Sequence, residues 1–144
     1  MIRFLTLAIF FSLAFALPVP AASDDEVAAH RVALELAGAF SNAGFKIRDG
    51  NWSGPIAPKQ SVFVQVNLYS GNEYWFCVGA TDKAKKVVVT VFDENGLPVT
   101  PSDTYQDGIK SAVGFSPTSS GAYIIRVQET DGAAASYCML YSYK

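Results

Sequence analysis

Histidine is the scarcest of the reactive residues in this chain of 144 residues, which contains only His30. A Ser-His-Asp or Cys-His catalytic arrangement would have to use this side chain. His30 stands beside Arg31 in a stretch with helical spacing, and no nucleophile pattern surrounds it. A zinc site would need more ligands than one histidine and two distant cysteines supply. We therefore predict a surface histidine, no catalytic residues, no cofactor and a protein that is not an enzyme.

Charge is also scarce, and neither sign dominates. Lysine and arginine number 11 against 13 acidic residues, which gives a formal net charge of −2. This mild acidity argues against nucleic acid and anionic membranes as partners. One small basic cluster, formed by Lys83, Lys85 and Lys86, precedes a β-branched run. Its expected role there is to protect a strand edge from aggregation.

Long apolar runs are limited to one, which extends from Phe4 to Leu17. Arg3 precedes it, and a segment of proline and small residues follows it up to Ala22. This order is typical of a secretory signal peptide over residues 1–22, and the run is too short for a stable membrane span. We expect an exported protein, periplasmic or secreted, with no membrane attachment after cleavage. The mature part would have 144 − 22 = 122 residues, the size of one domain.

Cysteine is limited to Cys77 and Cys138. In an exported protein an even pair most often forms one disulfide, and the alternative is two buried thiols. We predict the disulfide. Closing a loop of about 60 residues would stabilise the fold by roughly 3–4 kcal/mol in the chain-entropy model.

The segment 24–43 has the pattern of a helix. Ser23 followed three residues later by Glu26 is a capping box, with acidic residues at the positive end of the helix. Apolar side chains then recur at helical spacing, at Val32, Leu36 and Phe40. We predict one amphipathic helix that packs this stripe against the rest of the protein.

Beyond residue 44 the apolar residues change to a period of two, which is typical of β-strands. Five segments show it: 62–68, 74–78, 109–115, 123–128 and 137–143. The continuous β-branched run 87–92 predicts a central strand. The segment 47–59 is expected to be a loop, and 97–106 a long irregular connection or an edge. Turn signals roughly every 8–12 residues favour an antiparallel sandwich or barrel.

Four segments of this β-rich part follow the order of features in a known domain family. They are Tyr-Trp-Phe-Cys-Val at 74–78, a strand with an Asp-Glu-Asn-Gly turn at 89–96, a Pro, Gly-x-Tyr and Arg-Val step within 115–127, and Ser-Tyr-Cys-Met-Leu at 136–140. Over residues 74–141 the chain thus resembles bacterial pre-peptidase C-terminal domains.

This resemblance implies a mainly β fold, an antiparallel jelly-roll-like β-sandwich, here with one N-terminal α-helix. It also implies a non-catalytic accessory of secreted enzymes. The chain departs from the family in its helix and in carrying no enzyme domain within these 144 residues. The organisation that we predict is a signal peptide (1–22), an N-terminal helix (23–44) and a β-sandwich domain (45–144).

Aromatic side chains supply the candidate ligand-binding residues, Trp52, Trp75 and Tyr105. An exposed Trp can form a platform for a sugar or a peptide. By strand parity Trp75 shares the outer face of its strand with Cys77, and this face either carries such a platform or lies beneath the helix. We favour the covered arrangement, because an amphipathic helix needs an apolar surface.

Carboxylates supply a candidate cation site. Asp82, Asp103 and Asp107 fall in predicted loops and could surround calcium, which takes six or more oxygen ligands. No segment has a known calcium-loop spacing, so solvated loop carboxylates are the simpler interpretation. The acidic pair at 93–94 is explained by turn chemistry.

Together these features predict an exported non-enzymatic binding or accessory module for a protein or carbohydrate ligand. Two alternatives stay open: a small hydrolase or lyase that uses carboxylates and tyrosines, and an inhibitor of a secreted enzyme. An open cleft with converging carboxylates would favour the enzyme, and a flat aromatic strip would favour sugar binding. A protruding loop, such as 97–106, would favour the inhibitor.

Overall fold

The computed structural model describes residues 22–144. The predicted signal segment 1–22 lies outside the described residues except for Ala22. The elements in chain order are α1 (Asp24–Gly38), the 3-10 helix η1 (Ser41–Ala43), β1 (Lys46–Ile47), β2 (Trp52–Ile56), β3 (Ser61–Leu68), β4 (Tyr74–Ala80), β5 (Ala84–Phe92), β6 (Asp103–Asp107), β7 (Lys110–Phe115), β8 (Gly121–Gly132) and β9 (Ala135–Tyr143). Within 22–144, neither helix has the length and apolar content that crossing a membrane would require.

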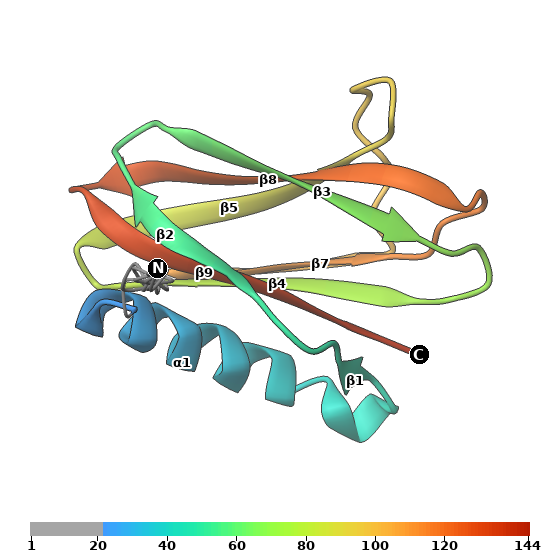
Figure 1. Ribbon diagram of the computed structural model, residues 1–144, viewed down its shortest axis with the longest axis horizontal. Coiled ribbons are helices and arrows are strands. Elements are labelled where there is room, and N and C mark those ends of the chain that lie inside the picture. The colour runs from blue at the N-terminus through green and yellow to red at the C-terminus, as the bar shows by residue number, and fades with distance from the viewer. Residues whose placement is uncertain (1–21) are drawn as a thin grey trace, which may run out of the picture.

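Two antiparallel sheets stack face to face and form a β-sandwich (Figure 1). The larger sheet has the order β1-β9-β4-β7-β6, with β2 also paired to β9, and the smaller sheet has the order β3-β8-β5. α1 lies across the outer face of the larger sheet (Figure 1). This arrangement confirms the predicted fold class, a mainly β sandwich with one N-terminal helix.

The strand order is that of a jelly roll with one strand displaced. From β2 onward, an eight-stranded jelly roll would place β2-β9-β4-β7 in one sheet and β3-β8-β5-β6 in the other. In this protein β2-β9-β4-β7 are neighbours in the larger sheet and β3-β8-β5 in the smaller sheet, as in a jelly roll. β6 instead pairs with β7, from Asp103 opposite Gly114 to Asp107 opposite Lys110. The displaced strand widens the larger sheet.

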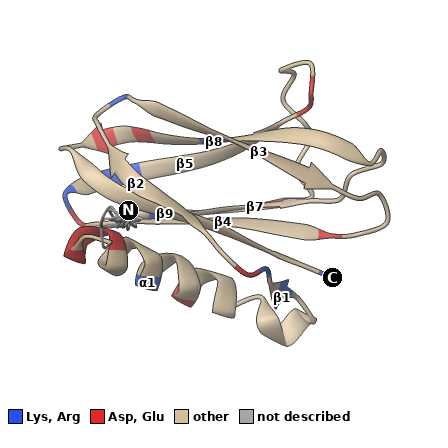
Figure 2. Ribbon diagram, viewed as in Figure 1, with Lys and Arg blue, Asp and Glu red and all other residues tan. Residues whose placement is uncertain are grey.

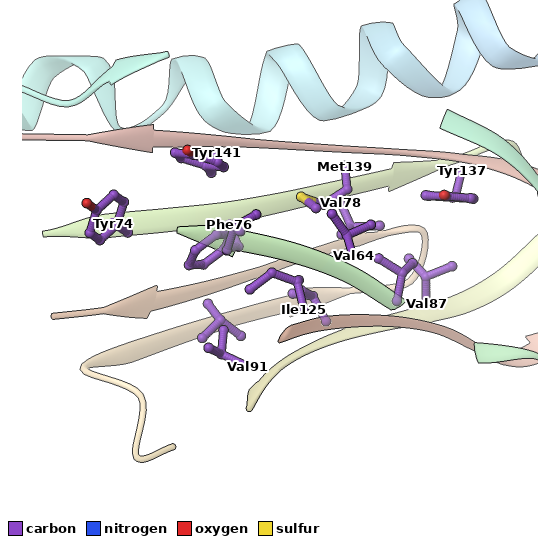
Figure 3. Packing of buried hydrophobic residues seen from close by; sticks show 14 of the residues in the cluster. Val64, Tyr74, Phe76, Val78, Val87, Val91, Ile125, Tyr137, Met139 and Tyr141 are labelled. Atoms are coloured by element: carbon purple, nitrogen blue, oxygen red, sulfur yellow. The ribbon is translucent and has the colours of Figure 1, made fainter. Parts of the chain in front are cut away.

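Alternate side chains of the facing strands fill the space between the two sheets (Figure 3). Phe76 and Val78 of β4 and Ile125 of β8 are fully buried there. The rings of Phe76 and Tyr141 contact each other with centroids 5.3 Å apart. The apolar residues that recur with a period of two in the sequence therefore point into one core between the two sheets.

The helix begins where the sequence predicts and ends earlier. The Ser23 hydroxyl accepts a hydrogen bond from the Glu26 amide at 3.1 Å, which satisfies one free N–H of the first turn. α1 ends at Gly38 instead of residue 43, and the separate 3-10 turn η1 follows. Gly44, at φ 91, closes this turn in the left-handed conformation that favours glycine.

The face of α1 that packs on the sheet is composed mainly of small residues. Ala29, Ala33 and Ala37 are buried, and Leu36 is nearly so, whereas Val32 and Phe40 are only partly buried. The sequence stripe Val32-Leu36-Phe40 therefore lies at one side of the true contact face. Small side chains allow the helix backbone to approach the strands closely.

Gly79 of β4 marks the point of closest approach. A Cβ atom at this position would lie 2.5 Å from the Ala33 nitrogen and 2.8 Å from the Ala29 carbonyl oxygen. Glycine is thus required by space, because the atoms that a side chain would meet belong to the helix backbone. We term the surface formed by α1 and the strands beneath it the helix-covered face.

The predicted disulfide between Cys77 and Cys138 is wrong, since both cysteines are free and buried in the helix-covered face. The register explains this result. Cys77 of β4 lies opposite Leu140, and Cys138 of β9 lies opposite Gly79, so the two cysteines are diagonal neighbours. Diagonal positions are about 7–8 Å apart, beyond the usual Cα separation in a disulfide.

Two further expectations need correction. The segment 47–59 is not a loop, because its residues 52–56 form β2, which pairs with β9. Its Pro55 is tolerated because β2 is an edge strand. The run 87–92 is not central either: β5 pairs only with β8 along its length. Its other edge is bonded partly by side chains, with the Gln106 amide donating to the Val87 carbonyl and the Val89 amide donating to Ser111. Backbone groups complete it, since the Val87 amide donates to the Gly108 carbonyl and the Val99 amide donates to the Val91 carbonyl.

Candidate functional site

Three loops gather at one end of the sandwich, on the right in Figure 1. They are the β3–β4 loop (69–73), the β5–β6 loop (93–102) and the β7–β8 loop (116–120). The β5–β6 loop projects well beyond the smaller sheet (Figure 1). We term these three loops the loop end. Loops on a rigid sandwich are the usual place for binding residues in this architecture.

Hydrogen bonds from side chains fix the conformation of these loops. The Tyr74 hydroxyl accepts from the Tyr69 amide at 2.9 Å, and the Ser120 hydroxyl accepts from the Ser70 amide at 2.9 Å. The second bond ties the β3–β4 loop to the β7–β8 loop. The Tyr123 hydroxyl donates to the Ser119 carbonyl at 2.7 Å. The loop end is therefore organised before any partner arrives.

The projecting β5–β6 loop is held by one carboxylate. Asp93 Oδ1 accepts from the amides of Asn95 and Leu97, both at 2.9 Å. A backbone hydrogen bond closes the same turn, with the Asp93 amide donating to the Leu97 carbonyl at 2.8 Å. Asp93 is thus a structural residue of the hairpin turn, as turn chemistry predicts from the sequence.

The loop end combines exposed apolar side chains with small polar residues. The β3–β4 loop reads Tyr-Ser-Gly-Asn-Glu, and Ser, Thr, Asn and Gly recur in the other two loops. Tyr69 and Leu97 are 63% and 62% exposed, so both present large apolar surfaces to solvent. Rigid aromatic anchors among adaptable polar groups are characteristic of antibody-type paratopes.

A hollow of about 490 Å³ lies between the β5–β6 and β7–β8 loops. Its lining includes the carboxylates of Asp93 and Glu94 and the hydroxyl side chains of Thr100, Thr118 and Ser119. One oxygen of Asp93, Oδ1, is engaged by the amides of the turn. The hollow therefore offers polar contacts from carboxylate and hydroxyl side chains.

The three aromatic candidates occupy three different environments. Trp75 lies beneath α1, where its ring stacks on Phe40 with centroids 4.0 Å apart and planes 11° from parallel. Trp52, at the start of β2, stacks on Tyr141 with centroids 6.2 Å apart. Tyr105 is 42% exposed on the edge strand β6. Trp75 is therefore partly covered on the helix side of the sheet, and Trp52 lines a hollow of about 320 Å³.

The carboxylates proposed for calcium are not brought together. Asp103 and Asp107 stand at opposite ends of β6, and Asp103 accepts a hydrogen bond from the Thr104 amide at 2.8 Å. Asp82 is exposed in the β4–β5 turn. Across residues 22–144, no group of three or more His, Cys, Asp or Glu side chains is placed to hold a metal ion. His30 is partly buried on α1.

Glu129 is a buried carboxylate that sequence reasoning missed. It is 0% exposed on β8, and neither carboxylate oxygen has a hydrogen-bond partner among the described residues. Burial first, and then the charge of Asp131, raise the pKa of its carboxyl above the ordinary value. Its place in the alternating pattern of β8, two residues after the buried Val127, was the available signal. It lies far along β8 from the loop end, which adjoins Gly121 at the other end of the strand.

Among solved structures the chain has distant likenesses only at the level of the fold. No protein-family model matches the chain, and no curated protein matches it. One solved structure, the periplasmic inhibitor of g-type lysozyme PliG from Aeromonas hydrophila, superposes with a TM-score of 0.46 at 14% identity. The match covers 66% of this chain and 85% of that one. At this TM-score the two folds differ too much in arrangement for a function to be carried from one to the other.

Proposed function

We propose that this protein is an exported, non-enzymatic module that binds a protein partner through the loop end. The observation that supports this proposal is the pre-organisation of three loops around exposed Tyr69 and Leu97. A rigid surface loses little conformational entropy on binding, so more of the contact energy appears as affinity. An accessory role of the kind that pre-peptidase C-terminal domains have would use such a surface.

A more specific candidate within this class is inhibition of a secreted enzyme. The β5–β6 loop supports it, because this hairpin projects from the sandwich and is braced by Asp93 (Figure 1). Its acidic residues, Asp93 and Glu94, give the projection a negative charge that is visible in Figure 2. A narrow, rigid and acidic projection suits the active-site cleft of an enzyme that acts on a polymer.

Photo-crosslinking in the producing cell tests the binding proposal. A benzophenone amino acid replaces Tyr69 or Leu97, and Phe63 on the outer face of β3 is the control because it is 63% exposed as well. We expect protein adducts of one defined mass at positions 69 and 97 and none at 63. Equal adducts at all three positions, or none at 69 and 97, would contradict the proposal.

An activity assay tests the inhibitor candidate. Cell-wall lysis by a g-type lysozyme is measured with the protein and with its Leu97→Ala and Phe63→Ala variants. Inhibition that Leu97→Ala weakens by about 10-fold or more, and that Phe63→Ala leaves unchanged, is the expected result for a hot-spot residue. Undiminished lysis at an excess of protein would reject this enzyme as the partner and leave the crosslinking test to identify another.

A further inference from the structure

A second surface, distinct from the projecting hairpin, is formed by residues of β3, β4 and β9 and by the segment 48–52. Two adjoining hollows of about 300 and 320 Å³ lie there, and both are lined by Arg48, Asn67, Tyr69 and Tyr141. The other lining residues are Trp52, Gln65, Val66, Asn72, Tyr74 and Tyr143. We term this surface the aromatic groove. It shares Tyr69 and Asn72 with the loop end and contains none of the β5–β6 or β7–β8 loop residues.

Arg48 is positioned in this groove by its backbone and by two rings. Its amide donates to the Tyr141 carbonyl at 2.9 Å, which fixes the start of the side chain. The guanidinium carbon lies 5.4 Å from the ring centroids of both Trp52 and Tyr141. Stacking on two rings holds the planar guanidinium in one orientation and leaves its N–H edge available.

The charge of Arg48 is not neutralised within the described residues. Ion pairs in this part of the chain join Lys83 to Asp25 and Lys144 to Glu73, and none involves Arg48. Its side chain donates from Nη1 to the Asp49 carbonyl at 3.1 Å, and this acceptor carries no formal charge. No acidic residue lines either hollow. The groove therefore has one fixed positive charge and complements an anion, most specifically a carboxylate or another planar oxyanion.

The remaining lining favours a hydroxylated ring. Gln65, Asn67 and Asn72 supply amides, each with donor and acceptor groups, which match sugar hydroxyls that also donate and accept. Tyr69 and Tyr143 are 63% and 40% exposed, so their rings are available for stacking. Val66 is the one aliphatic residue in the lining, and a peptide would find no apolar pocket for its side chains.

We propose that the aromatic groove binds a saccharide that carries a carboxylate, such as a uronic acid. The guanidinium of Arg48 takes the carboxylate through two parallel hydrogen bonds, and the amides take the ring hydroxyls. The exposed tyrosine rings cover the apolar face of the sugar. The groove overlaps the loop end at Tyr69 and Asn72, but Arg48, which carries this proposal, lies outside the loop end.

Calorimetry with matched disaccharides tests the proposal. The acidic probes are cellobiouronic acid and digalacturonic acid, and the neutral counterparts are cellobiose and galactobiose. We expect at least one acidic probe to bind about 10- to 100-fold more tightly than its neutral counterpart, as a charged hydrogen-bonded pair allows. Arg48→Gln removes this preference. Arg48→Lys retains only part of it, because an ammonium lacks the planar fork.

Matched controls separate this result from the other surface. Arg31→Gln removes the same charge from an exposed position on α1, and Leu97→Ala alters the loop end; both should leave the preference unchanged. A preference that survives Arg48→Gln would overturn the proposal. So would tighter binding of an acidic peptide such as acetyl-Gly-Glu-Gly-amide, or no binding of either acidic probe at millimolar concentration.

Discussion

The helix-covered face is built from Ala29, Ala33, Ala37 and Gly79, whereas the loop end is built from Tyr, Ser, Gly and Asn. In the first region, apolar atoms of the helix and the sheet lie in direct contact, and water is excluded. In the second region, side-chain oxygens bond backbone amides while the outer surfaces of Tyr69 and Leu97 stay in solvent.

This difference shows how one fold divides its surfaces between stability and binding. Close packing buries Cys77 completely and Trp75 partly. Hydrogen bonding fixes the loops without covering them. A binding partner therefore finds a rigid surface at the loop end and only the outer side of α1 at the helix-covered face.

The largest effect should come from Gly79→Ala, which breaks the helix-covered face. The new Cβ meets helix backbone atoms that cannot rotate away. We expect a loss of about 3 kcal/mol or more in the free energy of unfolding, measured by urea denaturation. Gly38→Ala is the matched control, because nothing lies within 4 Å of a Cβ there, and it should not destabilise the protein. Equal stability of the two variants would show that α1 is not docked as described.

A smaller loss should follow Phe40→Ala. The variant removes the ring that stacks on Trp75, but Phe40 is only partly buried, so the cost should be about 1–2 kcal/mol rather than that of a full core deletion. Tryptophan fluorescence should shift to the red as Trp75 gains water. Phe63→Ala, on an exposed position, serves as control. An unchanged denaturation midpoint for Phe40→Ala would mean that the helix end contributes nothing.

A loss of about 1 kcal/mol is expected from Asp93→Ala at the loop end. The change leaves the amides of Asn95 and Leu97 without their acceptor. Asp93→Asn keeps an acceptor oxygen and should recover most of the loss. Both are measured by thermal unfolding. If Asp93→Ala and Asp93→Asn were equally stable, the carboxylate would not be bracing the hairpin.

The smallest effect should be that of a reducing agent on stability, because Cys77 and Cys138 are not bonded. Burial raises their pKa values to about 12 and about 11, so both remain thiols at neutral pH and react slowly in the folded protein. A thiol reagent should label both only after unfolding. A loss of roughly 3–4 kcal/mol on reduction would instead indicate a disulfide.

Most of the helices and strands could be predicted from local periodicity in the sequence. The alternation in β3, β4, β8 and β9 predicted the strands, and Ser23 with Glu26 predicted the helix start. β3 and β8 are buried on one side only, whereas β9 is buried on both, because α1 covers its outer face. What failed depends on pairing between distant segments. The register that separates Cys77 from Cys138, and the partner of β2, are set by β9, which is far away in the sequence.

The surfaces were less predictable than the strands. Trp52 is a candidate from residue type alone, but the stacking of Arg48 on Trp52 and Tyr141 joins three segments and leaves no local pattern. The spacing of Ala29, Ala33 and Ala37 was visible in the sequence, and together with Gly79 it could have indicated the close helix contact. The meeting of three loops follows from the sandwich topology and not from any motif.

Amide hydrogen exchange of the free protein tests most directly whether the loop end is organised before binding. The amides of Tyr69, Ser70, Asn95 and Leu97 donate to side-chain oxygens in the structure. Their exchange should be slowed well below the rate of an unstructured chain. Exchange of all four at the unstructured rate, while the strands stay protected, would contradict the account.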